Sequence, residues 1–386
     1  MVNYLRTVFN IQFKYHAYFE VIRDFRKGGL TPNNYDSFIS EIDALPKQDM
    51  PKVSKLLEIG AKYGLSNITE EDFTAIMREV QKRAKMLSKK CWHPDASKEK
   101  CHTDPAGNII ISAAHSIQNN GILKKIAKNG HVKTYEIDGG EFDGKLVSKN
   151  VASTFYGFCN RHDAIFRPIE VDPYVGSTEQ HFLFAYRGFV VSMHAKEATS
   201  YYMNYGDQAL NDIAENKKIF DDIITNKSFD QVVTHEYRLN AHYPIAASSA
   251  FYLEMDFNGT EIKHSDKRME FVFVTLYPEE RETIFLLSYF RQDEQLYRGL
   301  ADQLFLRQNL KSDISILLAP NVENIFFEPS YFDTFIPQQN DILLQAFREA
   351  AYQIVKLDEE NQISEETSLT PPNFLSNQLK VNLFGY

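Results

Sequence analysis

The chain has 386 residues, of which 43% are hydrophobic and 24% are charged, a composition typical of a folded soluble protein with two or three domains. No apolar run reaches the roughly 18 residues that a membrane-spanning helix needs, and the N-terminus lacks the apolar core and cleavage site of a signal peptide. We therefore expect a cytoplasmic protein with no membrane partner. The net charge of −10 argues against a dedicated nucleic-acid binder.

The charge is unevenly distributed along the chain. Residues 81–170 carry 15 Lys and Arg against 9 Asp and Glu, a net charge of +6, whereas the rest of the chain has a net charge of −16. This basic segment could contact the phosphate backbone of DNA or RNA. Alternatively, its lysines and arginines form the solvated face of a helix.

Residues 1–88 are expected to form a helical region. Phe73, Ile76, Val80 and Ala84 recur at helical spacing. Thr69, three residues before Asp72, predicts an N-cap at the start of this helix.

The character of the sequence changes in residues 89–175. Short apolar runs at 109–111 and 151–158 predict strands, and a short helix is expected between them, over 117–126. A helical turn is expected to follow residue 160. The pattern predicts a small α+β module.

Residues 176–235 are expected to form a helical connector, and residues 236–386 a C-terminal α+β domain with an antiparallel sheet. Its strands are expected at 252–257, 271–276 and 283–289, with a hairpin turn at 258–259. Its helices are expected at 293–309 and 338–356, followed by a mobile acidic tail at 358–372. The fold class is therefore predicted to be α+β, in three parts joined by a helical connector.

All three cysteines of the chain lie between positions 91 and 159. Zinc prefers thiolate and imidazole ligands in a tetrahedron. Cys159 and His162 form a compact chelating turn, and Cys91 with Cys101 can supply two further ligands. These four residues predict one structural zinc site.

Other ligand sets stay open in the sequence. His93, His102 and His131 are close enough along the chain to replace one of the four, and a histidine that follows the first predicted strand, His115, could displace Cys91 or His162. The cysteines could also be small buried hydrophobic residues without a metal.

The order of these motifs resembles that of the HNH, or ββα-metal, nuclease domain. A cysteine pair is followed by a strand ending in His115-Ser116-Ile117, and a second strand leads into Cys159-Asn160-Arg161-His162. Residues 91–190 also resemble a group of uncharacterised bacterial proteins that share an AHSIQ…GFCxxHD core. The HNH resemblance implies that His115 is the general base and that Asn160 and Asp163 lie beside a catalytic Mg²⁺ or Mn²⁺. It suggests a metal-dependent nuclease, with a role in bacterial defence against viruses.

The sequence departs from the HNH pattern at two points. The position before the general base usually carries a metal ligand, but here it is Ala114. If His162 binds the structural zinc, Asp163, Asn160 and Glu170 are the residues left for a second ion. An alternative hypothesis is therefore a non-enzymatic zinc-stapled protein that binds a protein partner. No phosphate-binding glycine loop that would indicate a nucleotide cofactor occurs in the sequence.

Overall fold

The computed structural model describes residues 14–45, 53–138, 141–203, 207–265, 267–307, 309–343 and 381–385. The described part of the chain divides into two compact units. The first contains the residues up to Lys89 together with His194–Leu210, and the second contains Lys90–Met193 and the described residues from Asn211 onward. No helix among the described residues is long and apolar enough to cross a membrane.

The first unit is helical, as predicted. Its helices are α2 (Tyr15–Asp24), α3 (Tyr35–Asp43), α4 (Val53–Lys62) and α5 (Glu70–Leu87). The expected N-cap is present, because Thr69 Oγ1 accepts the Asp72 N–H at 3.1 Å and the Asp72 carboxylate accepts the Thr69 N–H at 3.3 Å. Ile76, Val80 and Ala84 of α5 are buried, so the predicted helical spacing marks its packed face.

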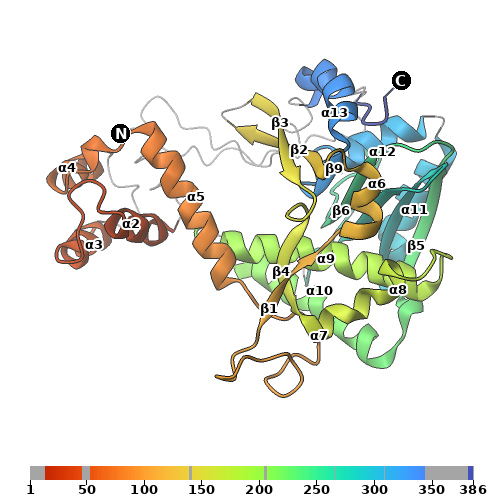
Figure 1. Cartoon of the computed structure of the whole chain (residues 1–386), viewed down its shortest axis with the longest axis horizontal. Helices are drawn as coiled ribbons and strands as arrows, with labels where there is room; N and C mark the ends of the chain where they lie inside the picture. Colours follow the sequence, from red (N-terminus) through yellow and green to blue (C-terminus); the bar gives the residue numbers. More distant parts are fainter. Residues whose placement is uncertain are drawn as a thin grey trace. The chain divides into compact units, whose positions relative to one another are not determined.

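Two sheets organise the second unit (Figure 1). The smaller pairs β1 (Ile111–His115) with β4 (Thr154–Cys159), and β4 leads directly into α7 (Asn160–Asp163). The larger has seven strands in the order β3-β2-β9-β6-β7-β8-β5. Its strands are β2 (His131–Asp138), β3 (Glu141–Ser148), β5 (Val232–Leu239), β6 (Ile245–Phe251), β7 (Val272–Pro278), β8 (Thr283–Phe290) and β9 (Ile325–Phe327).

The chain between β1 and β4 leaves the small sheet and joins the large one. It contains α6 (Lys124–Ile126) and the hairpin of β2 and β3, and β2 pairs with β9 at Lys133 and Phe327. The segment 89–175 thus supplies strands to both sheets. All pairs in the large sheet are antiparallel, which confirms the predicted C-terminal antiparallel sheet and the α+β class.

Helices cover both faces of the large sheet (Figure 1). On β7, Val272 and Val274 belong to the core that includes α11 (Glu294–Leu306) and α12 (Leu310–Leu318). Phe273 belongs instead to the core that includes α9 (Thr178–Ser200) and α10 (Asp207–Asn226). This second core also contains Phe158 of the small sheet and Trp92 of the loop before that sheet. The small sheet therefore shares a hydrophobic core with one face of the large sheet. Two further helices are α8 (Arg167–Glu170) and α13 (Pro329–Phe335).

Some expected elements lie elsewhere. The prediction of a strand at 252–257 is wrong. These residues form turns with one isolated bridge, between Met255 and Glu261. The strand in this part of the chain is β6, which ends just before them. Every residue of β6 is buried and the strand is rich in Ala and Ser, so it shows neither alternation nor strong strand propensity. The strand β5 begins at Val232, within the expected helical connector. Residues 344–356 of the helix expected at 338–356, and the tail expected at 358–372, lie outside the described residues.

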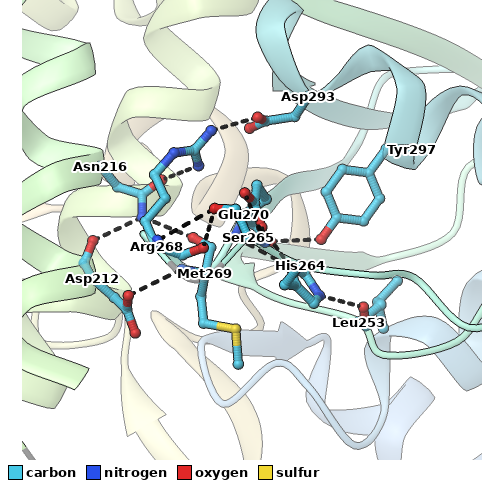
Figure 2. A network of polar contacts seen from close by, with 10 residues as sticks. All are labelled: Asp212, Asn216, Leu253, His264, Ser265, Arg268, Met269, Glu270, Asp293 and Tyr297. Carbon is cyan, nitrogen blue, oxygen red and sulfur yellow. Dashed lines mark hydrogen bonds and ion pairs between the residues drawn. The ribbon is translucent and has the colours of Figure 1, made fainter. Parts of the chain in front are cut away.

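A buried polar network ties the segment between β6 and β7 to the neighbouring helices (Figure 2). Arg268 donates to Asn216 of α10 at 3.0 Å and to the carboxylate of Asp293, which precedes α11. His264 contacts Glu270 at 2.9 Å through Nδ1. The second oxygen of Asp293 is buried and has no hydrogen-bond partner among the residues that the structure describes, and burial raises the pKa of this carboxyl to about 6. The network positions the segment at the cost of a poorly solvated carboxylate.

Candidate metal centre and the His115 site

The structure brings the four predicted zinc ligands together. Nδ1 of His162 lies 3.4 Å from the sulfur of Cys91, 3.5 Å from that of Cys101 and 3.3 Å from that of Cys159. The sulfurs of Cys91 and Cys159 are 4.0 Å apart, and the four atoms all lie within 4.8 Å of one another. This group could hold a metal ion.

The distances match the edges of a zinc tetrahedron. With Zn–S bonds of about 2.3 Å and Zn–N bonds of about 2.0–2.1 Å, a regular tetrahedron has S···N edges of about 3.6 Å and S···S edges of about 3.8 Å. A disulfide between Cys91 and Cys159 would need sulfurs about 2.05 Å apart, and all three cysteines are free. The donor set and its spacing therefore fit a four-coordinate metal ion.

Local backbone structure supports the thiolates. Burial raises the pKa of Cys91 to about 12, and the N–H groups of Cys159 and His93 oppose this rise. At Cys159 burial also acts to raise the pKa, but the N–H groups of His102 and His162 contribute to a net lowering. Because a metal ion displaces thiol protons, such N–H groups around sulfur favour the metal-bound form.

The three alternative histidines lie outside this group. The ring of His93 stacks on that of His162, with centroids 4.2 Å apart, and its Nδ1 accepts the Asp95 N–H at 3.1 Å. The side chain of His102 is exposed, and His131 lies on β2 with Nδ1 2.9 Å from the Asn129 carbonyl. None of the three contributes an atom to the cluster.

His115 is also separate from the metal group and is held in a defined orientation. It ends β1 opposite Thr154 of β4. Its Nδ1 lies 3.0 Å from the Ala152 carbonyl and 3.3 Å from the Ser153 hydroxyl. A carbonyl can only accept, so Nδ1 carries a proton and a neutral ring has its lone pair at Nε2.

Ser153 is the residue that shapes this loop. Its φ of +58° lies in the left-handed region, which is unusual for a serine. Its Oγ contacts both the carbonyl and the N–H of Ile117, at 3.1 and 3.3 Å, and its carbonyl accepts the Ser116 N–H at 2.9 Å. These bonds hold the left-handed conformation and present the Ala152 carbonyl to His115.

Burial lowers the pKa of His115. The Ala152 carbonyl opposes this shift, the charge of Arg187 adds to it and the charge of Glu170 opposes it. Burial raises the pKa of Asp163, and the same two charges act on that carboxyl. The charges of Arg187 and Glu170 thus act on both His115 and Asp163. Asn160, the first residue of α7, is exposed.

The sequence interpretation did not include Arg187. Its side chain is 4% exposed and donates to Glu170 at 2.5 Å. One signal was present, because Arg187 lies within the largely apolar run of residues 182–193. A charge in a helix that is apolar on all sides must be paired or functional.

A cleft of about 690 Å³ adjoins this site, and its volume suits a small ligand. Gln118 and Glu170 line one part, and Tyr174, Phe184 and Tyr277 contribute aromatic side chains. Its rim carries two ion pairs, Lys125 with Glu279 at 2.5 Å and Arg238 with Glu282.

Comparison of the chain with protein-family models, with curated proteins and with solved structures found no match.

Proposed function

We propose that the cluster of Cys91, Cys101, Cys159 and His162 holds a structural zinc ion. Three thiolates and one imidazole at tetrahedral spacing are a typical closed structural zinc site, with no open position for a substrate. The ion would join the loop of residues 91–101 to the start of α7 and so stabilise the small sheet that carries His115.

We further propose that the chain hydrolyses phosphodiesters of DNA or RNA in the manner of an HNH-like nuclease, with His115 as general base. The observation that carries this proposal is the orientation of the ring. The Ala152 carbonyl holds the proton on Nδ1, the lowered pKa keeps the ring neutral, and Nε2 has no hydrogen-bond partner among the described residues. Such a nitrogen can accept a proton from an attacking water molecule.

The carboxylates of Asp163 and Glu170 are the ligands that this site offers to Mg²⁺ or Mn²⁺. Mg²⁺ is commonly held by one or two carboxylates together with substrate phosphates, so the donor type of these two residues suits such an ion. When bound, the ion would stabilise negative charge on the phosphate. The net charge of +6 over residues 81–170 supports a nucleic-acid substrate.

A second candidate is a non-enzymatic binding protein in which the zinc has only a structural role. One observation favours it: the described residues contain a single group of three or more possible metal ligands, and that group is the cysteine cluster. Glu170 is also already paired with Arg187. The acidic remainder of the chain would then favour a protein partner.

One experiment separates the two candidates. Plasmid DNA and a structured RNA are incubated with the protein and Mg²⁺ or Mn²⁺, beside His115→Ala and His131→Ala, the latter a matched change at an exposed histidine. The nuclease proposal predicts cleavage that falls by at least about 100-fold in His115→Ala, the usual contribution of a general base, and persists in His131→Ala. Absence of cleavage with either ion, while zinc stays bound, would favour the binding protein.

A further inference from the structure

Arg187 is a buried cation whose hydrogen-bonding capacity is only partly used. A guanidinium has five N–H donors and stays protonated inside proteins. Burying such a charge is costly unless its donors are satisfied. The side chain of Arg187 is only 4% exposed, because it projects from a helix packed in a hydrophobic core. Its partners should therefore account for most of its donors.

The partners of Arg187 among the described residues do not account for most of its donors. Nη2 donates to Oε1 of Glu170 at 2.5 Å, and the guanidinium carbon lies 4.1 Å from the ring centroid of Phe166. Nε is buried and has no hydrogen-bond partner in the described part of the chain. Phe166 packs against the guanidinium, while its Nε–H stays unused. A buried donor without a partner requires an explanation.

The place of the ion pair suggests what the unused donor is for. Glu170 lines the cleft and its side chain is 31% exposed, so the pair lies at the boundary between the cleft and the core. The same two charges act on His115. Arg187 does not itself line the cleft but is paired with Glu170, which does. The cations that line the cleft differ from Arg187: Lys125 and Arg238 are paired with glutamates, and Arg281 is exposed.

We infer that Arg187 is the anion-binding residue of this site and takes a phosphate group, as a monoester or a diester, that enters the cleft beside Glu170. The planar fork of a guanidinium matches two phosphate oxygens. Glu170 neutralises Arg187 while no anion is bound. The inference deepens the proposed nuclease function and rests on it for the identity of the substrate, but anion binding is measurable without catalysis.

Calorimetric titration with inorganic phosphate and with adenosine 5′-monophosphate tests the inference on the full chain. Arg187→Met is expected to weaken binding by about 10- to 100-fold, the usual effect of losing a charge-assisted hydrogen bond. Arg187→Lys, which keeps the charge without the planar fork, should give an intermediate affinity. Arg281→Met, the matched change at the exposed cation of the same cleft, should stay within about 3-fold of the unchanged chain, because a solvated cation contributes little.

Glu170→Gln provides a test of opposite sign that does not depend on the folding of Arg187→Met. It removes the carboxylate charge that competes with phosphate, so phosphate should bind more tightly. Equal affinities in the unchanged chain and Arg187→Met would overturn the inference. The inference would also be overturned if Glu170→Gln bound phosphate more weakly than the unchanged chain, or if Arg281→Met lost phosphate binding and Arg187→Met did not. Acetate that bound as tightly as phosphate would overturn it as well.

The inference and the proposed nuclease can fail separately. If no nucleic acid is cleaved but phosphate binding still depends on Arg187, the nuclease proposal falls and the anion site stands. If cleavage depends on His115 while phosphate affinity does not depend on Arg187, the anion site falls and the nuclease proposal stands.

Discussion

Removal of one metal ligand tests the zinc site most directly, and Cys159→Ser is the change to make. Structural zinc contributes about 10–16 kcal/mol in small zinc-binding peptides, or about 2.5–4 kcal/mol for each of four ligands. Nδ1 of His162 is within 3.5 Å of all three sulfurs, so the ligands converge on one point. We therefore expect the serine variant to bind zinc at least about 100-fold more weakly.

The loss of zinc should be visible in the only tryptophan of the chain. Trp92 is fully buried, adjoins Cys91, and donates its backbone N–H to the Gly157 carbonyl at 2.9 Å. Chelation of zinc should therefore shift its fluorescence to longer wavelength. A 100-fold loss of affinity also removes about 2.7 kcal/mol of stability when zinc is in excess.

The assay is zinc content after dialysis against a chelator of graded strength, with Trp92 fluorescence as a second readout. His102→Ala is the control, since its imidazole is exposed and only its backbone N–H acts on Cys159. Unchanged zinc content in Cys159→Ser would refute the assignment. A loss of zinc in His102→Ala would show instead that the ligand set is wrong.

Three further changes test the fold, each followed by urea denaturation or hydrogen exchange. Gly188→Ala should destabilise the second unit by about 1–2 kcal/mol, because the added Cβ would lie 2.9 Å from a backbone oxygen of β6. Gly299→Ala should stabilise it by up to about 1 kcal/mol, because no described atom would lie within 4 Å of the added Cβ. Equal effects would refute the close packing of α9. Thr69→Ala should cost the first unit about 1 kcal/mol by removing the cap of α5, with faster exchange in its first turn. Asp293, whose pKa burial raises to about 6, holds its proton more tightly in the folded chain than in the unfolded one. The unchanged chain should therefore lose up to about 3 kcal/mol relative to Asp293→Asn as the pH rises from about 4 to about 6, and a constant difference over that range would contradict the reasoning.

Local signals in the sequence predicted much of the fold. The helix α5 was predictable because its cap, Thr69, directly precedes the 18-residue helix that contains its buried face. The strands β7 and β8 are apolar runs bounded by turns, and both lie close to their expected positions. The β6 strand was missed because its own residues give no strand signal. It becomes a strand through pairing with β7 and with the distant β9. The three-residue strand β9 has no local signal of its own.

The candidate site divides in the same way. Cysteine and histidine are typical zinc ligands, so the sequence could indicate the four candidate ligands, while the choice among the neighbouring histidines needed the structure. The pairing of Arg187 with Glu170 could not be predicted from the sequence, because it depends on how α9 packs against α8. The orientation of His115 depends on the left-handed backbone at Ser153, which nothing in the sequence marks.

The insertion of β2 and β3 between the two strands of the small sheet has a consequence for how the chain is made. All four candidate metal ligands have been synthesised once residue 162 is added, whereas β9, which joins β2 to the rest of the large sheet, is synthesised much later. Until then the β2–β3 hairpin has an unpaired edge, and such edges promote association between chains. A metal ion bound early would close the base of this hairpin and hold it in place for the partner strand. A fragment that ends soon after the metal site should therefore bind the ion and still aggregate.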